Sequence, residues 1–352
     1  MHFRYILQII PITILLGCSS SDDLSPEQEH PSVRSSAEIN ADECRWIYRQ
    51  MNHYYLWRAD LPDSLSCDYS LEPAVFFKSL LSPKDRFSYC THNTNYSGPA
   101  TVVLDDTGDD LFTSPTRGGS KSSVLLDSIY FINDKKIGYL CYLEFSNAVE
   151  LVPIMRRFWK EHVDELIVDL RFNPGGYVSV CRYLSNCVIA KAAYGEVFQY
   201  KVYNDIMSAE LLKRTGKDKE WESYEYPPPS YEGLLGTPVY PLDMQRVYVL
   251  TSNRTASASE AFIVCLRPFT ETIIIGDQTV GKGVGSFTVR ESQYYYELHP
   301  ITMRYYNSVM DTTPDEGFVP DFLVSGGDKT YVGDIGRVDE PLLAVALQRI
   351  FQ

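Results

Sequence analysis

Apolar segments of strand type and of helix type alternate from Val124 to the end of the chain, and this alternation limits the fold more than any other feature. Between Ala148 and Glu161 the apolar side chains recur at the 3.6-residue period of a helix. Strands that alternate with helices build layered α/β domains, because the helices cover the faces of a sheet. The sequence therefore predicts an α/β domain over residues 124–352. Its strand-like segments are "SVLLDSIYFI", "KKIGYLCYLEF", "ELIVDL", "RVYVLTS" and "TIIIGD".

A smaller helical region is predicted before this domain, over residues 39–90. The segment "DECRWIYRQMNHYYLW" places apolar residues three and four positions apart, which indicates an amphipathic helix. Residues 91–123 are rich in Gly, Ser, Thr and Asp, so we interpret them as a connector. Near the other end of the chain, Asp339 and Pro341 indicate the N-cap and the first turn of a final helix.

The first 18 residues have the pattern of a bacterial export signal. Their apolar run, from Tyr5 to Gly17, is too short to cross a bilayer core of roughly 30 Å as a helix. We interpret it as part of a signal peptide over residues 1–18. It ends in "LLGC", which resembles the lipobox of bacterial lipoproteins and implies lipidation of Cys18. Residues 19–38 are polar and without periodicity, which indicates a disordered tether.

These N-terminal features predict a cell-envelope lipoprotein that a lipid anchor attaches to the outer membrane, on its periplasmic or its external face.

The charge and the composition of the chain argue against nucleic acids and metal ions as partners. The formal net charge is −14 and the isoelectric point is about 4.9, so a nucleic-acid backbone would repel the chain. The sequence has no CxxC pair and no HExxH motif, and its six histidines are scattered. We therefore predict no nucleic-acid partner, no metal and no cofactor.

Three segments stand at the ends of predicted strands, where α/β folds place functional groups. The first ends in Gly175 and Gly176, whose backbone amides can face a ligand without a Cβ in between. The second, Thr251–Glu260, opens a helix with small residues, so a serine there exposes its hydroxyl beside amides that can bind an oxyanion. Taken singly, the first segment also fits an ordinary turn and the second an ordinary helix cap.

The third segment, Gly276–Gly283, contains Lys282 between two glycines. It matches the GxxxxGK pattern of nucleotide-binding loops, but Gly283 replaces the Ser or Thr that would hold magnesium, and a strand is predicted to follow. The alternative is a base: burial favours the neutral amine of a lysine, and a neutral amine can take the proton of a serine hydroxyl. No histidine has comparable local support, so the three segments together indicate a Ser/Lys hydrolase.

Four segments, in this order, resemble the signatures of the C-terminal processing peptidases, also called tail-specific proteases. In that family the nucleophile is the middle serine of the small-residue run and the lysine follows 25 positions later, which selects Ser257 and Lys282. The resemblance implies an α/β peptidase domain with a crotonase-like and ClpP-like β/α spiral core. "YYLW" and "KDRFSY" also resemble the N-terminal helical region of Bacteroidetes-type lipoprotein members. The four segments are "DLRFNPGG", "VYVLTSNRTASASEAF", "IIIGDQTVGKGVGSF" and "GFVPD".

The resemblance also implies roles for the neighbours of the nucleophile. The amide of Ala258 and an amide of the turn at Gly175 and Gly176 would bind the oxyanion. Glu260 lies one helical turn beyond the nucleophile, so it is expected either to position the nucleophile or the base, or only to stabilise the start of a helix. Many members of the family carry a glutamine four residues after the lysine, which hydrogen-bonds the lysine amine. Ser286 stands at that position here, so it is the corresponding candidate for positioning Lys282.

A PDZ domain usually separates the two regions in this family. Residues 91–123 are too few for a complete PDZ fold, so this domain is expected to be truncated or missing, with the strand-like "ATVVLDD" as a remnant. Whether a PDZ-type module captures the C-terminal carboxylate of a substrate is therefore open.

The sequence thus predicts a serine-type endopeptidase that hydrolyses extended or unfolded polypeptides through a Ser257/Lys282 dyad and an acyl-enzyme. The alternative from another class is a non-catalytic surface lipoprotein that binds peptides on the same scaffold. A hydrolase of small acyl substrates is chemically compatible, but the family's pattern does not support it. Cleavage of a denatured protein distinguishes these hypotheses.

Overall fold

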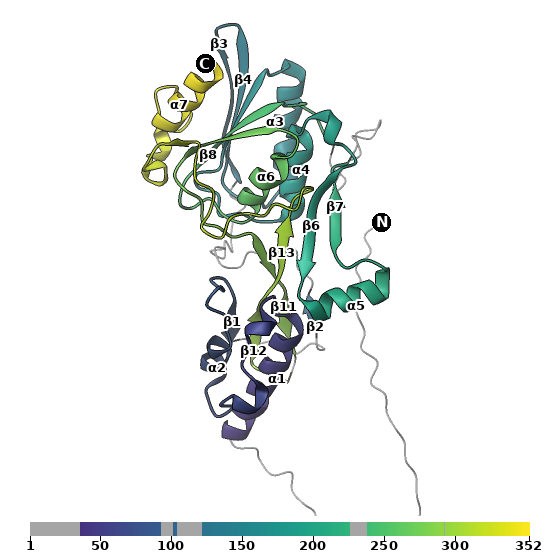
Figure 1. Cartoon of the computed structure of the whole chain (residues 1–352). Helices are drawn as coiled ribbons and strands as arrows, with labels where there is room; N and C mark the ends of the chain where they lie inside the picture. Colours follow the sequence, from purple (N-terminus) through teal and green to yellow (C-terminus); the bar gives the residue numbers. More distant parts are fainter. Residues whose placement is uncertain (1–35, 93–100, 104–121, 226–237, 292) are drawn as a thin grey trace, which may run out of the picture.

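The computed structural model describes residues 36–92, 101–103, 122–225, 238–291 and 293–352 of the 352-residue chain. The predicted signal peptide, Cys18 and nearly all of the predicted tether lie outside the described residues, as does most of the predicted connector. In Figure 1 the large sheet and its helices form the upper part of the molecule, and long strands join them to the N-terminal helices below.

The central sheet has the strand order β14-β9-β8-β5-β4-β3. All neighbours in it are parallel except β3 and β4, which are antiparallel. Every residue of β5 is buried, as expected for a strand that is covered on both faces. This mixed sheet confirms the predicted α/β class. Its strands are β3 (Val124–Ile132), β4 (Lys135–Tyr142), β5 (Glu165–Asp169), β8 (Arg246–Thr251), β9 (Glu271–Gly276) and β14 (Phe322–Leu323).

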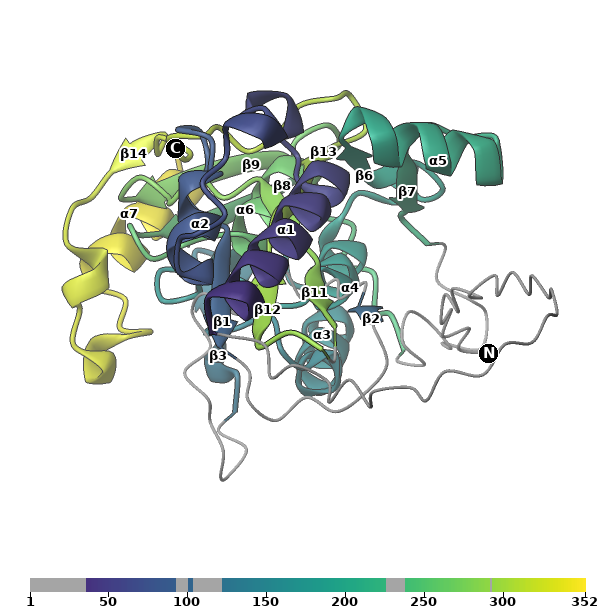
Figure 2. The same ribbon diagram turned by 90° about the horizontal axis from the view of Figure 1, so that it is seen from below.

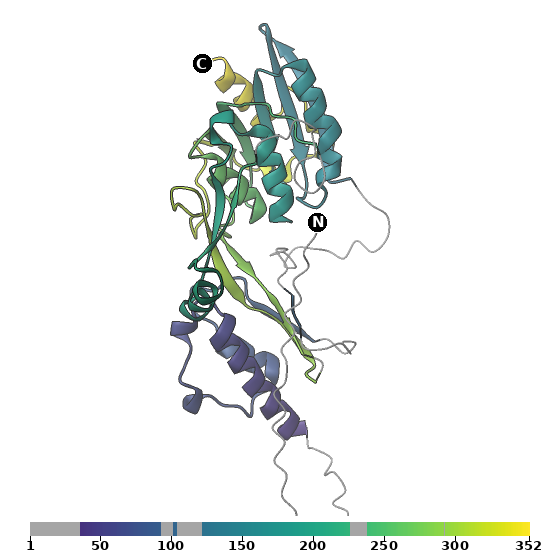
Figure 3. The same ribbon diagram turned by 90° about the vertical axis from the view of Figure 1, so that its right-hand side faces the viewer.

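Helices cover both faces of this sheet, and Figure 3 shows the yellow α7 and the teal helices on opposite sides of it. Side chains alternate along each strand and so supply two separate cores. In β4, for example, Leu140 packs in the core that contains Phe158 of α3, whereas Tyr139 packs in the core that contains Leu343 of α7. The helices are α3 (Ala148–Glu161), α4 (Val178–Val188) and α6 (Ala258–Leu266) on one face and α7 (Pro341–Ile350) on the other.

Side-chain caps explain where these helices begin. The side chain of Asn147 accepts a backbone N–H of the first turn of α3. At α7 the prediction is wrong by one residue: Glu340, not Asp339, is the N-cap, and its carboxylate accepts the N–H of Leu343 at 3.0 Å. Pro341 occupies the first turn as predicted. The cap falls on Glu340 because a buried arginine of the core binds the same carboxylate, and a local pattern does not reveal such a partner.

Two long segments of extended chain connect the core to the N-terminal region (Figure 1). The first segment contains β10 and β11, and the second contains β12 and β13. β10 and β13 belong to the sheet β10-β13-β6-β7, whereas β11 and β12 belong to the sheet β1-β12-β11-β2. The predicted strand "ATVVLDD" contains β2, which pairs with β11. The strands are β1 (Tyr89–His92), β2 (Thr101–Val103), β6 (Val197–Tyr203), β7 (Glu220–Ser223), β10 (Val284–Ser286), β11 (Thr288–Arg290), β12 (Tyr296–His299) and β13 (Ile301–Tyr306).

The predicted N-terminal helical region is present. Seen from below in Figure 2, α1 lies across the strands β11 and β12. Trp46 and Phe77 from the helices pack with Val289 and Leu298 from the strands in a third apolar core. The helices of this region are α1 (Ser36–Tyr54) and α2 (Pro73–Ser79), and the remaining helix, α5 (Asp205–Thr215), comes later in the chain. Short 3-10 turns lie at Arg58–Asp60, Ser64–Ser66, Lys191–Ala193, Gly327–Lys329 and Val332–Asp334.

Candidate active site

The three segments indicated by the sequence meet at one edge of the central sheet. They follow β5, β8 and β9, which are parallel neighbours, so their carboxyl ends lie together. Backbone hydrogen bonds join them: Ala256 N–H donates to Asn173 O at 3.3 Å, and Val280 N–H donates to Thr255 O at 3.0 Å. The fold therefore brings the glycine turn, the serine turn and the lysine loop into one place.

Ser257 occupies a sharp turn between β8 and α6. It is the N-cap of α6, and its φ of 55° with ψ of −115° is a conformation that residues with a Cβ rarely adopt. A comparable strand–turn–helix geometry exposes the nucleophile of α/β-hydrolases. Ser257 is partly buried, whereas Ala256 and Ala258 on either side of it are buried. The turn thus presents the serine rather than its neighbours.

The carboxylate of Glu260 connects the serine turn to the lysine loop. Its Oε2 accepts the N–H of Ser257 at 3.0 Å and the N–H of Lys282 at 2.8 Å. Its Oε1 accepts the N–H of Gly281 at 2.7 Å and the hydroxyl of Thr279 at 2.5 Å. Burial raises the pKa of Glu260 above its ordinary value, although these hydrogen bonds oppose the rise. Glu260 therefore does more than stabilise the start of α6, because it also binds the loop that carries Lys282.

Lys282 lies in a tightly enclosed loop and is only 3% exposed. The preceding Gly281 has a φ of +88°, and a Cβ there would lie 2.1 Å from Asp315 O, so the loop requires glycine at this position. The strand β10 follows, as predicted, and not the helix of a nucleotide-binding loop. The Nζ of Lys282 lies 5.8 Å from the centre of the Phe87 ring.

Gly175 and Gly176 stand against the serine turn. A Cβ on Gly175 would lie 2.8 Å from the Cβ of Ser257 and 3.1 Å from the nitrogen of Ala258, so only glycine permits this approach. The N–H of Gly175 already donates to Asn173 Oδ1 at 2.9 Å. Ala258 is the first residue of α6, and the N–H groups of a first helical turn have no acceptor within the helix. The turn of Gly175 and Gly176 therefore lies against the start of α6, and the pairing of one of its amides with the amide of Ala258 at an oxyanion stays a prediction.

Ser286, which stands where many relatives have glutamine, is the last residue of β10. It is half-buried and pairs with Ile301 of β13, where the register of the two strands shifts. The structure thus places Ser286 on the strand that leaves the lysine loop. A role for it in orienting Lys282 stays a prediction.

Sequence reasoning missed two residues that reach the site from the N-terminal region. The guanidinium of Arg86 donates to Asp315 O at 2.7 Å and to Val280 O at 3.1 Å, and Phe87 lies beside the side chain of Lys282. Both belong to "KDRFSY", which the sequence indicates only as part of the helical region. No local pattern relates this segment to a lysine so far along the chain.

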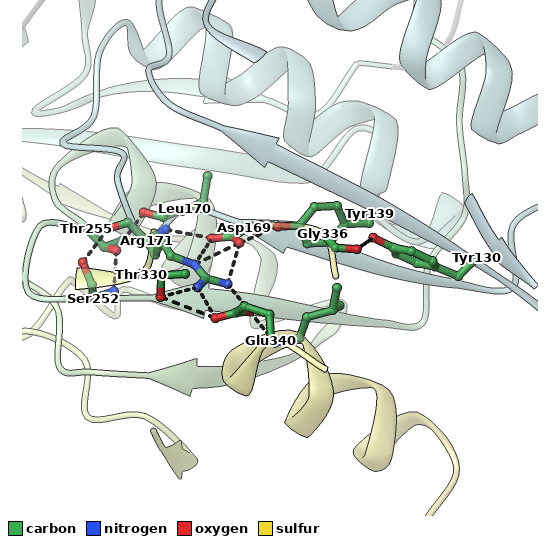
Figure 4. Close-up of polar contacts among 11 residues, drawn as sticks. Tyr130, Tyr139, Asp169, Leu170, Arg171, Ser252, Thr255, Thr330, Gly336 and Glu340 are labelled. Atoms are coloured by element: carbon green, nitrogen blue, oxygen red, sulfur yellow. Dashed lines mark hydrogen bonds and ion pairs between the residues drawn. The ribbon is translucent and has the colours of Figure 1, made fainter. Parts of the chain in front are cut away.

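A buried network of charges lies next to the site, and Figure 4 shows Arg171 between Asp169 and Glu340. The Nε of Arg171 lies 3.0 Å from both carboxylate oxygens of Asp169, and its terminal nitrogens lie 2.6 and 2.9 Å from the oxygens of Glu340. The hydroxyl of Tyr139 donates to Asp169 at 2.7 Å, and the hydroxyl of Ser252 donates to the backbone oxygen of Arg171. The network therefore joins the segment after β5 to the serine segment and to α7.

Within the described part of the chain, no group of three or more His, Cys, Asp or Glu residues is arranged to hold a metal ion. Among the helices of the same ranges, none combines the length and the apolar character of a membrane span.

The family model of peptidase family S41 matches residues 136–324, more than half of the chain. The chain belongs to peptidase family S41. The model of the peptidase S41 N-terminal domain matches residues 42–89, which include Arg86 and Phe87. Family membership thus confirms the resemblance to C-terminal processing peptidases, whereas a truncated or missing PDZ domain stays a prediction.

Curated relatives in this family include C-terminal processing proteases. The carboxy-terminal processing protease CtpB of Bacillus subtilis is 24% identical over 170 residues, which are 46% of this chain and 30% of that protein. The carboxyl-terminal-processing protease of Picosynechococcus sp. is 25% identical over 191 residues, which are 53% of this chain and 39% of that protein. The chain therefore spans well under half the length of these curated relatives.

Solved structures share the fold over most of the chain. A candidate S41 protease from Bacteroides fragilis superposes with a TM-score of 0.67 at 21% identity, covering 87% of this chain and 97% of that one. The photosystem II D1 C-terminal processing protease superposes with a TM-score of 0.53 at 12% identity, covering 83% and 94%. At such identities the likeness shows a common fold.

Proposed function

We propose that the chain is a serine-type endopeptidase in which Ser257 is the nucleophile and Lys282 is the general base. The observation that carries the proposal is the carboxylate of Glu260, because one of its oxygens accepts the backbone N–H groups of both residues. A strained, partly exposed serine is thereby held beside a loop whose lysine is buried. Membership of a peptidase family and C-terminal processing proteases among the relatives support the same class of reaction.

In the proposed reaction, the Oγ of Ser257 attacks the carbonyl carbon of a substrate peptide bond, and the hydroxyl proton passes to the neutral Nζ of Lys282. The carbonyl electrons move onto the oxygen and give a tetrahedral oxyanion. When this intermediate collapses, the C–N bond breaks, the leaving amine takes the proton from Lys282, and an ester to Ser257 remains. Water then attacks the ester, with Lys282 again accepting the proton, and the carboxylic acid product leaves as the serine hydroxyl re-forms.

The surroundings of the two residues suit this chemistry. The side chain of Lys282 is enclosed by the protein and has almost no contact with bulk water. The amide of Ala258 and an amide of the turn at Gly175 and Gly176 are the proposed donors to the oxyanion, and donors that are already in place need no reorganisation during the reaction. No step requires a metal or an organic cofactor.

The proposed substrates are extended or unfolded polypeptides, as the resemblance implies. The test incubates the chain that begins after Cys18 with an unfolded protein, beside Ser257→Ala and Lys282→Ala variants, and reads fragments by mass spectrometry. Cleavage by the wild type that both substitutions abolish supports the dyad. If the wild type binds the polypeptide but leaves it intact, the non-catalytic peptide-binding alternative replaces the proposal.

We also propose that Cys18 carries a lipid and anchors the protein in the outer membrane. The support is the apolar run that ends in "LLGC", followed by a polar stretch of tether composition. The full chain and a Cys18→Ala variant are expressed in a bacterium with an outer membrane, and the membranes are separated from the soluble fraction. The wild type is expected with the membranes and the variant in the soluble fraction. A variant that still partitions with membranes contradicts the anchor.

A further inference from the structure

The chain from Asp85 to Ser88 brings two side chains of the N-terminal region to the lysine loop of the core. The ring centre of Phe87 lies 5.8 Å from the Nζ of Lys282, and the central carbon of the Arg86 guanidinium lies 5.1 Å from the same ring centre. The side chains of Arg86 and Lys282 thus lie near the same aromatic ring. That ring comes from outside the sheet that carries the serine and lysine segments.

Arg86 also binds the backbone on both sides of the lysine loop. It donates to the oxygen of Val280, two residues before Lys282, and to the oxygen of Asp315. These two stretches already touch, because a Cβ on Gly281 would lie 2.1 Å from Asp315 O. A planar guanidinium offers several N–H donors in fixed directions, which allows one side chain to join two carbonyls. Arg86 therefore fixes the loop against the chain that encloses it.

A preformed turn presents these two side chains. The Oδ1 of Asp85 accepts the N–H groups of Phe87 and Ser88, each at 2.9 Å. Its Oδ2 accepts the hydroxyl of the buried Tyr55 at 2.8 Å, and that hydroxyl accepts the N–H of Ser82 at 2.9 Å. An aspartate that binds the backbone two residues ahead stabilises a turn locally. The position of the Phe87 ring is therefore set by the core of the N-terminal region.

We propose that Arg86 and Phe87 are positioning residues for Lys282, so that the N-terminal region forms part of the active site. The inference rests on the proposed role of Lys282 as the base. Arg86 binds the carbonyls of Val280 and Asp315 around the lysine loop, and the ring of Phe87 lies 5.8 Å from the Nζ of Lys282, so together they limit where the amine can lie. A base has to lie within hydrogen-bond reach of the hydroxyl whose proton it takes.

Other charged groups also face the lysine loop. Glu260 binds the backbone of the loop from α6 with its negatively charged carboxylate. The carboxylate of Asp315 has the same sign, but Arg304 of β13 binds it at 2.7 Å. Glu260, Asp315 and Arg304 stay unchanged in the variants below. Differences in labelling rate between those variants therefore report on Arg86 and Phe87.

The test measures how fast a fluorophosphonate probe labels Ser257, since this probe reacts with an activated serine and needs no bound polypeptide. Rates and melting temperatures are measured for each variant at about pH 8. We expect Phe87→Ala and Arg86→Gln to react about tenfold more slowly than the wild type. Phe87→Leu keeps an apolar side chain beside the amine and Arg86→Lys keeps a hydrogen-bond donor, so each should restore part of the rate.

Arg45→Ala is the matched control, because Arg45 lies beside Tyr69 at 5.7 Å and pairs with Asp42, both within the N-terminal region. It should label at the wild-type rate. Wild-type rates for Phe87→Ala and Arg86→Gln would overturn the inference. So would slower labelling that accompanies a lower melting temperature and that neither conservative variant restores, because that result indicates a purely structural role. The proposed function fails separately, if Lys282→Ala labels as fast as the wild type.

Discussion

At the scale of single residues, the candidate site is built from positions that allow one type of side chain only. Gly175 approaches Ser257 so closely that a Cβ would lie 2.8 Å from the serine's own Cβ. Ser257 itself has a positive φ although it is not a glycine, and such a conformation costs about 1–3 kcal/mol. The cost is tolerated because the hydrogen bond from Ser257 N–H to Glu260 and the start of α6 over-determine the turn.

Gly175→Ala tests this close approach. We expect labelling of Ser257 by a fluorophosphonate to fall at least about 100-fold, because the new methyl group displaces Ser257 from the proposed oxyanion donors. The control is Gly216→Ala at the end of α5, which has a φ of +75° and open space around its Cβ. The control should lose about 1 kcal/mol of unfolding free energy and keep its labelling rate. Unchanged labelling in Gly175→Ala would show that the glycine turn does not set the position of Ser257.

Glu260→Gln tests the shared carboxylate. In this variant an amide NH2 group replaces one of the two carboxylate oxygens, each of which accepts two hydrogen bonds. The N–H groups of the new amide would then point at the N–H or O–H groups that this oxygen bound. We expect the unfolding free energy to fall by about 2 kcal/mol and the labelling rate by about 100-fold. Urea unfolding and probe labelling measure the two effects. Glu271→Gln, at an exposed position at the start of β9, should change neither, and equal behaviour of the two variants would contradict the role of Glu260.

At the scale of elements, Arg171 determines how α7 is attached to the sheet. Glu340 caps α7 and binds Arg171 with the same carboxylate, so the start of the helix and the ion pair depend on one side chain. Burial acts to raise the pKa of Glu340, but the hydrogen bonds and charge of Arg171 outweigh it, so the pKa lies below its ordinary value of 4.5. A buried pair of this kind is costly to break on one side only.

The lowered pKa of Glu340 predicts how stability depends on pH. A carboxyl whose pKa is lower in the folded state contributes stability above its ordinary pKa and loses it as the pH falls through the folded value. Glu340→Gln should therefore be less stable than the wild type by about 3 kcal/mol at about pH 6, and the difference should narrow toward about pH 3. Urea unfolding at several pH values measures this. A difference that stays constant with pH would mean that the pKa of Glu340 is the same in the folded and the unfolded protein.

At the scale of the whole molecule, the N-terminal region and the core share the same strands. β10 and β11 leave the lysine loop, and β12 and β13 return beside them (Figure 1). Val289 and Leu298 on these strands complete the apolar core of α1 and α2. The packing of α1 and α2 therefore stabilises the strands that continue directly from the loop of Lys282.

Leu298→Ala tests this coupling. Leu298 is fully buried, so we expect a loss of about 3 kcal/mol in unfolding free energy, and labelling of Ser257 should slow under conditions where the variant is still folded. Leu347→Ala in α7 is the matched control, because it removes the same atoms from the core on the far side of the sheet. It should destabilise the protein without slowing the labelling of the folded enzyme. Equal labelling rates in the two variants would show that the N-terminal core does not affect the site.

The sequence by itself determines the features that depend on neighbours along the chain. The alternation of strands and helices predicts the α/β class, and periodic apolar residues predict α1 and α3, because backbone geometry fixes which side chains share a face. The order of the glycine, serine and lysine segments at strand ends also predicts that they meet. Parallel neighbouring strands direct their carboxyl ends to one edge, so local patterns suffice for this part of the site.

The tertiary structure decides the features that depend on partners far along the chain. Asp339 and Glu340 are nearly equivalent as local caps, and Arg171 decides between them because a buried guanidinium requires carboxylate partners. The sequence alone also allows Glu260 to be an ordinary helix cap. Only the folded chain brings the lysine loop close enough for the same carboxylate to bind both Ser257 and Lys282. Arg86 and Phe87 carry no local signal, because they act on a loop that the folded chain brings to them.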